Sequence, residues 1–101
     1  MMLSTVPTNL EKVGKDNLDK EILRLAIIAE LDAINLYEQM AALADDKLIK
    51  MTLLDIAKEE KTHVGEFQAL LLTNDRQQEA ELAEGKKEVN ELTGKLKNKA
   101  V

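Results

Sequence analysis

Glu60 and His63 are the two residues of this 101-residue chain whose types and spacing most clearly allow chemistry. His63 is the only histidine, and it lies in the run D-I-A-K-E-E-K-T-H-V-G-E-F over residues 55–67. Apolar residues in and around this run recur at helical spacing, which predicts an α-helix. Residues three apart lie on one face of a helix, so Glu60 and His63 present a carboxylate and an imidazole side by side. The pair is therefore predicted to form half of a metal site projecting into a helical bundle.

A second acidic residue, Glu30, lies in the middle of the apolar run L-A-I-I-A-E-L-D-A-I-N-L-Y. A carboxylate in such a run costs free energy unless a partner compensates it. The break between the two long apolar segments predicts an antiparallel hairpin that turns near residue 45. Glu30 is fifteen residues before that turn, and Glu60 and His63 are fifteen and eighteen residues after it. We therefore expect these three residues at one level of the hairpin, with Tyr37 nearby on the Glu30 face.

Two long helices and a short third helix are expected, and the two long helices are expected to position these residues. The predicted elements are an N-terminal arm over 1–16, helices over 17–43, 46–72 and 75–93, and a basic tail over 94–101. Asp16 or Asn17 is expected to cap the first helix and Asp45 or Asp46 the second, because these side chains accept hydrogen bonds from free backbone N–H groups. Asp75 is expected to cap the third helix in the manner of a capping box.

The first long helix is apolar on more than one side. Between Glu21 and Leu43, sixteen of twenty-three residues are apolar, counting alanine and tyrosine. A surface helix normally shows one apolar stripe, and a two-helix hairpin covers only one side. The excess apolar surface predicts a homo-oligomer in which another copy of the chain covers it.

Composition favours a single small all-α domain, because 45% of the residues are hydrophobic, only 2% are aromatic and there is one proline. The formal net charge of −5 weighs against nucleic acid as a partner. The lack of cysteine excludes thiolate chemistry. No run approaches the roughly 18 apolar residues of a membrane span, and the first residues do not resemble a secretory signal. We expect a cytoplasmic protein without a membrane partner.

The simplest alternative is that none of these residues binds metal. A lone histidine is usually a surface or core residue, Glu30 could pair with a lysine, and Tyr37 could fill the core. We favour metal because a two-fold dimer would unite two copies of Glu30, Glu60 and His63, and its four carboxylates would balance the charge of two Fe²⁺ ions. Zinc is possible, but carboxylate-rich sites without thiolates suit iron or manganese better.

The runs I-L-R-L-A-I-I-A-E-L-D-A-I-N-L-Y-E-Q and L-L-D-I-A-K-E-E-K-T-H-V-G-E-F resemble the encapsulated ferritins. These are truncated two-helix, ferritin-like proteins housed in encapsulin shells, and the resemblance covers about residues 20–94. It implies that Glu30, Glu60 and His63 bind iron at a dimer interface, with Glu60 bridging two ions and Tyr37 beside the site. It also implies that two hairpins form a ferritin-like four-helix bundle within a ring-shaped decamer.

The activity that this resemblance implies is that of a ferroxidase, which oxidises Fe²⁺ to Fe³⁺ with dioxygen and feeds iron storage and mineralisation inside an encapsulin nanocompartment. Other divalent ions, such as those of manganese, zinc or calcium, would substitute in a crystal. Some members have a second metal site; Asp32 matches one of its acids, whereas Ala29 replaces another, and Leu36 stands where some members have tryptophan. Some members are fused to the shell protein, so this chain could be free cargo or one domain of a fusion.

Two alternative functions stay open. One is a rubrerythrin-like peroxidase on the same di-iron site, although the chain has no cysteine for a rubredoxin electron donor. The other is a non-catalytic helical assembly module, in which Glu30 forms a salt bridge and His63 binds no metal.

Overall fold

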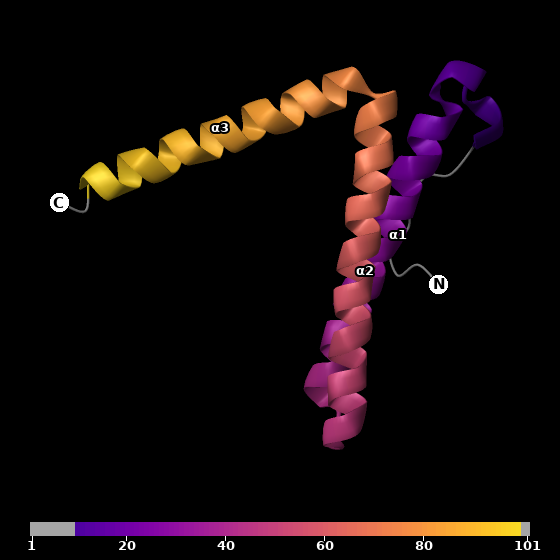
Figure 1. Ribbon diagram of the computed structural model, residues 1–101, viewed down its shortest axis with the longest axis vertical. Helices are drawn as coiled ribbons and strands as arrows, with labels where there is room; N and C mark the ends of the chain where they lie inside the picture. The colour runs from indigo at the N-terminus through magenta and orange to yellow at the C-terminus, as the bar shows by residue number, and fades with distance from the viewer. Residues whose placement is uncertain (1–9, 100–101) are drawn as a thin grey trace.

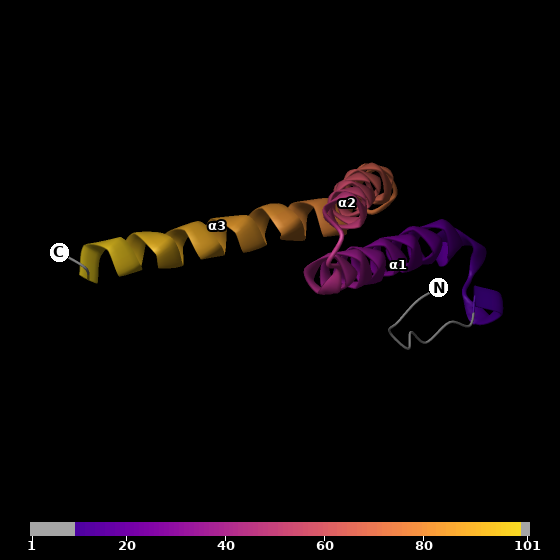
Figure 2. The same cartoon turned by 90° about the horizontal axis from the view of Figure 1, so that it is seen from below.

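The structure is a computed structural model that describes residues 10–99, and every regular element in this range is helical. A short 3-10 helix (Leu10–Lys12) precedes α1 (Lys15–Leu43), α2 (Lys47–Asn74) and α3 (Arg76–Lys99). α1 and α2 lie side by side as an antiparallel hairpin, whereas α3 leaves the end of α2 at a wide angle (Figures 1 and 2). The predicted all-α hairpin with a third helix is confirmed. None of the described helices is long and apolar enough to cross a membrane.

A polar cap residue explains where α2 begins, whereas α1 begins without one. Asp46 is the N-cap of α2, and its side chain accepts a hydrogen bond from the Ile49 N–H at 3.0 Å. Such a cap stabilises a helix by about 1 kcal/mol. The expected cap of α1 is wrong, because Gly14 occupies the N-cap position without a side-chain hydrogen bond. Asp16 lies instead in the first turn, where its negative charge complements the helix dipole.

α3 is longer than the sequence pattern predicted. The helix was expected to end at residue 93 and to give way to a basic tail, but it continues through Gly94 to Lys99. One glycine in an exposed helix costs only about 1 kcal/mol relative to alanine, and the lysines and leucine around it are good helix formers. Parts of the predicted arm and tail, residues 1–9 and 100–101, lie outside the described residues.

The hairpin has a thin core. The whole chain, with α3 extending from the hairpin, has a radius of gyration of 17.8 Å, whereas a compact chain of this length has about 13 Å. Its accessible surface is 8063 Å², against about 5,700 Å² for a folded monomer of this mass. The buried apolar residues in the described range are Ile34, Ala41, Ala57 and Leu71. The large apolar side chains of the hairpin that stay exposed are Ile22, Leu31, Met40, Leu43, Leu48, Ile49, Met51, Leu54 and Leu70.

Candidate metal centre

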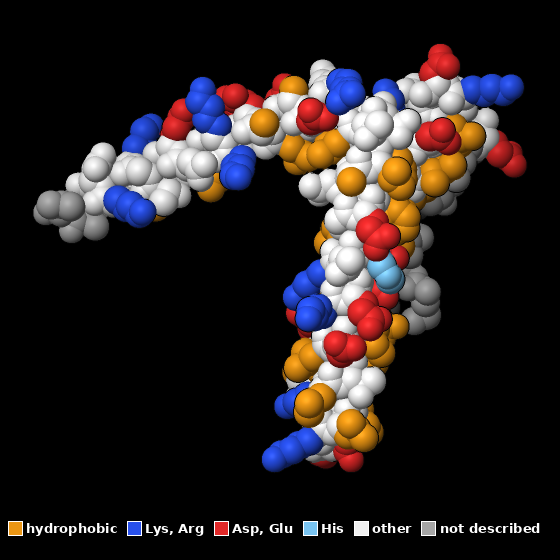
Figure 3. All heavy atoms as spheres, viewed as in Figure 1, with side chains coloured by type: hydrophobic (Ala, Val, Ile, Leu, Met, Phe, Trp, Pro, Cys, Tyr) orange, Lys and Arg blue, Asp and Glu red, His pale blue; other side chains and the backbone are white. Residues whose placement is uncertain are grey.

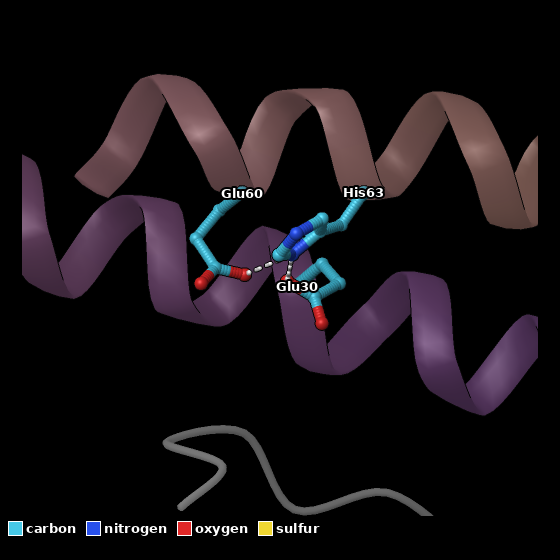
Figure 4. A group of neighbouring side chains, drawn as sticks. All are labelled: Glu30, Glu60 and His63. Atoms are coloured by element: carbon cyan, nitrogen blue, oxygen red, sulfur yellow. Dashed lines mark hydrogen bonds and ion pairs between the residues drawn. The ribbon is translucent and has the colours of Figure 1, made fainter. Parts of the chain in front are cut away.

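Glu30, Glu60 and His63 meet midway along the hairpin (Figure 4). Glu30 comes from α1, and the other two residues come from adjacent turns of α2. His63 Nδ1 lies 3.4 Å from Glu30 Oε2 and 3.4 Å from Glu60 Oε2. One possible ligand atom from each residue lies within 4.8 Å of the other two. The sequence analysis expected these three residues at one level of the hairpin, because they are about equally far from the turn. The structure brings them together there.

Glu30 gives the clearest physical sign that a cation belongs here. Its Oε2 atom is buried, and no hydrogen-bond donor within the described residues satisfies it. The nearest nitrogen, His63 Nδ1 at 3.4 Å, is farther than the 2.7–2.9 Å typical of a charge-assisted hydrogen bond. A buried acceptor without a donor costs about 1–3 kcal/mol, and more when it is charged. A positive ion bound to this oxygen would remove that cost.

The spacing and the chemistry of the three side chains also fit a metal ion. Two ligand atoms that each lie about 2.1 Å from one ion are about 3.0 Å apart in octahedral geometry and about 3.4 Å apart in tetrahedral geometry. The two distances from His63 Nδ1 are 3.4 Å each, close to this range. The ligands are two carboxylates and an imidazole without a thiolate, a set that suits iron or manganese.

The candidate centre is open on one side. The side chains of Glu30 and Glu60 are 21% and 18% exposed, but that of His63 is 47% exposed. Figure 3 shows the histidine at the surface of the hairpin, with acidic side chains above and below it and apolar side chains close by. Three ligands do not complete the coordination sphere of iron, so the open side leaves positions for ligands from elsewhere. A second copy of the hairpin, related by a two-fold axis, would supply another such set.

Two other residues from the sequence analysis lie near the centre on α1. Tyr37 is partly buried and is seven residues from Glu30, which corresponds to about 10 Å along a helix. Asp32 is also partly buried. The roles of Tyr37 beside the site and of Asp32 in a second metal site stay predictions.

One residue with a structural role was not foreseen from the sequence. Arg24 of α1 donates a hydrogen bond from Nη2 to Asp75 Oδ2 at 2.6 Å. The available signal was a single cationic residue inside the otherwise apolar segment I-L-R-L-A. Since that signal does not name a partner, only the structure shows that Arg24 reaches the start of α3.

Comparison with known proteins supports the fold and the family. The sequence model of the Rubrerythrin family matches residues 21–101. A "Ferritin-like-encapsulin shell fusion protein" from Pyrococcus furiosus is 59% identical over 95 residues, which are 92% of this chain and 28% of that protein. The solved encapsulated ferritin domain from Pyrococcus furiosus is 57% identical with a TM-score of 0.78, over 91% of this chain and 96% of that one. The ferritin-like fold and the resemblance to encapsulated ferritins are confirmed, and this chain spans little more than a quarter of the fusion protein.

Proposed function

The chain belongs to the rubrerythrin family, and from that premise we propose that it is a ferroxidase that oxidises Fe²⁺ to Fe³⁺ with dioxygen. The observation that carries this proposal is the group of Glu30, Glu60 and His63, in which a buried carboxylate oxygen has no hydrogen-bond donor. Fe²⁺ is the substrate of this reaction. Dioxygen is the oxidant and takes one electron from each Fe²⁺.

The proposed site lies between two copies of the hairpin. Each copy contributes Glu30 and His63 as ligands to one iron and Glu60 as a bridge between the two irons. The four carboxylates then carry four negative charges, which two Fe²⁺ ions balance, so that burial of the site no longer leaves unpaired charge. The contribution of the protein is positional, because it holds two irons close enough to deliver electrons to the same dioxygen molecule.

We also propose that the oxidised iron is stored inside an encapsulin shell. The fusion relative from Pyrococcus furiosus combines a ferritin-like part with an encapsulin shell part in one protein. This chain matches only 28% of that relative, so it is proposed to act either as cargo or as one domain of a similar fusion. A ring-shaped decamer of hairpins, built from the two-fold dimers, is the proposed assembly.

Stopped-flow absorbance after mixing with Fe²⁺ in air tests the ferroxidase assignment. Glu60→Ala and His63→Ala are each expected to abolish fast oxidation and to leave the far-ultraviolet circular dichroism helical, because neither side chain belongs to the buried apolar core. Glu81→Ala is the matched control, since it removes an exposed carboxylate from α3. Oxidation at the wild-type rate by either ligand variant would contradict the assignment.

The family match gives one rival function a specific basis, namely peroxide reduction of the rubrerythrin kind. The same stopped-flow experiment under anaerobic conditions, with hydrogen peroxide in place of dioxygen, separates the two functions. A ferroxidase is expected to react faster with dioxygen, whereas faster oxidation by peroxide would favour the peroxidase.

The other rival, a non-catalytic assembly module, requires that Glu30 be satisfied by a salt bridge. Within the described residues, the ion-pair contact of Glu30 Oε2 is with His63 Nδ1 at 3.4 Å, which is a salt bridge only if the imidazole is protonated, and no hydrogen-bond donor satisfies this oxygen. Metal analysis of protein purified without chelator provides the direct test, because a module of this kind would contain no bound metal.

A further inference from the structure

Asp75 connects all three helices at the elbow between α2 and α3. It is the single residue between α2 and α3, and only 9% of it is exposed. Its Oδ1 accepts a hydrogen bond from the Gln78 N–H at 3.0 Å, which caps α3. Its Oδ2 accepts a hydrogen bond from Arg24 Nη2 of α1 at 2.6 Å. Asp75 is thus the C-cap residue of α2, and its carboxylate caps α3 and binds α1.

Beyond its first turn, α3 buries little of its surface against the hairpin. Every side chain from Glu79 to Asn98 is exposed. Figure 1 shows that α3 extends away from the hairpin rather than along it. The direction of α3 therefore depends on the groups at the elbow.

An apolar hollow of about 350 Å³ lies next to the elbow. Arg24 and Gln78, the two residues that bind Asp75, form part of its wall. Its lining includes Arg24, Ile27 and Ile28 of α1, Leu71 of α2, and Gln78 and Leu82 of α3. Arg24 and Gln78 both bind Asp75. The hollow thus has its present shape only while α3 keeps its present direction.

We propose that the contact between Arg24 and Asp75 is a latch that fixes the direction of α3 relative to the hairpin. The contact is exposed on one side only, since the Arg24 side chain is 47% exposed and that of Asp75 is 11% exposed. It joins α1 to the single residue between α2 and α3, so it acts on the direction of α3 rather than on the pairing of α1 with α2. Its loss leaves the hairpin and α3 helical but lets α3 swing and opens the hollow. The latch is independent of the metal centre, because Arg24 is six residues from Glu30, about 9 Å along α1.

The test measures the distance between α2 and α3 by pulsed electron paramagnetic resonance. The chain has no cysteine, so Lys58→Cys and Asn90→Cys, both at exposed positions, place one spin label on each helix. Dilution with unlabelled chain restricts the measurement to distances within one subunit. The unmodified elbow is expected to give a single narrow distance population.

Arg24→Met keeps the apolar stem of the side chain and removes the guanidinium. Asp75→Ser keeps a capping oxygen for α3 but is too short to reach Arg24. Each variant is expected to lose the single narrow population and to give a broad one, with unchanged helix content and unchanged iron oxidation. Lys61→Met is the matched control, because it removes an ion pair between α1 and α2 that does not involve the elbow, Lys61 to Glu38, and it is expected to keep the narrow population.

A narrow, wild-type distance population in either Arg24→Met or Asp75→Ser would overturn the latch. Broadening in Lys61→Met to the same extent would also overturn it, because any weakening of the hairpin would then release α3.

Discussion

Removal of metal is expected to weaken assembly of the protein at neutral pH. In the proposed dimer, Glu30 and Glu60 of one copy meet those of the other, so four carboxylates share one site. Glu30 Oε2 already lacks a hydrogen-bond donor within the described part of one chain. Without a cation these negative charges repel one another. A divalent ion removes the repulsion and adds bonds from both subunits.

The stabilisation of the dimer by metal depends on the number of ions that it binds. One chain provides three ligand residues, so a dimer provides two sets and binds two ions. One chain alone already gathers three ligand atoms, so only the difference in affinity between the assembled and the separate chains favours assembly. An ion that binds the assembled state a hundred times more tightly than the separate chains stabilises it by about 2.7 kcal/mol. Two ions give about 5 kcal/mol, which corresponds to an increase of roughly 10⁴-fold in the association constant.

Sedimentation velocity at several chain concentrations is the appropriate assay, with chelator-treated protein compared before and after addition of Mn²⁺. Mn²⁺ resembles Fe²⁺ in its ligand preference, so it serves as the probe. Chelator-treated protein is expected to sediment as smaller species and to shift to the large assembly with Mn²⁺. Glu30→Ala loses both the repulsion and a ligand, so we expect partial assembly that no longer responds to metal. Glu38→Ala, at an exposed position of α1, is expected to respond as the wild type does.

A single mass for chelator-treated and metal-loaded wild type across the dilution series would refute this reasoning. It would mean that the exposed apolar surface of the hairpin is sufficient to close the interface. The metal would then bind to an assembly that forms without it.

Three further predictions concern the site, the product and the elbow. Tyr37→Phe is expected to keep bound metal, as measured by elemental analysis, and to slow turnover less than loss of a ligand; isolation without metal would instead make Tyr37 a ligand. The purified chain alone is expected to oxidise iron but not to keep it soluble, because a ring of hairpins has no closed cavity; soluble iron-loaded particles on size exclusion would contradict this. The pKa of Asp75 is lowered, chiefly by the Gln78 N–H and further by Arg24 and Lys20, against the opposing effect of burial. The elbow is therefore stabilised fully above the ordinary carboxyl pKa of 3.8 and loses this stabilisation as the pH falls through the lower value of the folded protein. The spin-label distance is expected to broaden only in that acidic range, and broadening well above it would show that another group titrates.

The sequence by itself determined the candidate site, because the relevant spacings are local. A helix places Glu60 and His63 on one face whatever surrounds it. Equal numbers of residues on both sides of a short turn bring Glu30 level with them. Asp46 and Asp75 cap their helices through hydrogen bonds to residues three positions away, which is also a local arrangement.

The tertiary structure decided how the third helix is placed. The Arg24–Asp75 contact joins residues 51 positions apart, and no periodicity relates positions at such a distance. The unsatisfied state of Glu30 Oε2 is likewise visible only once its neighbours are in place. Local spacing thus fixes which side chains share a helix face, whereas the direction of α3 and the environment of a buried oxygen depend on groups that only folding brings into contact.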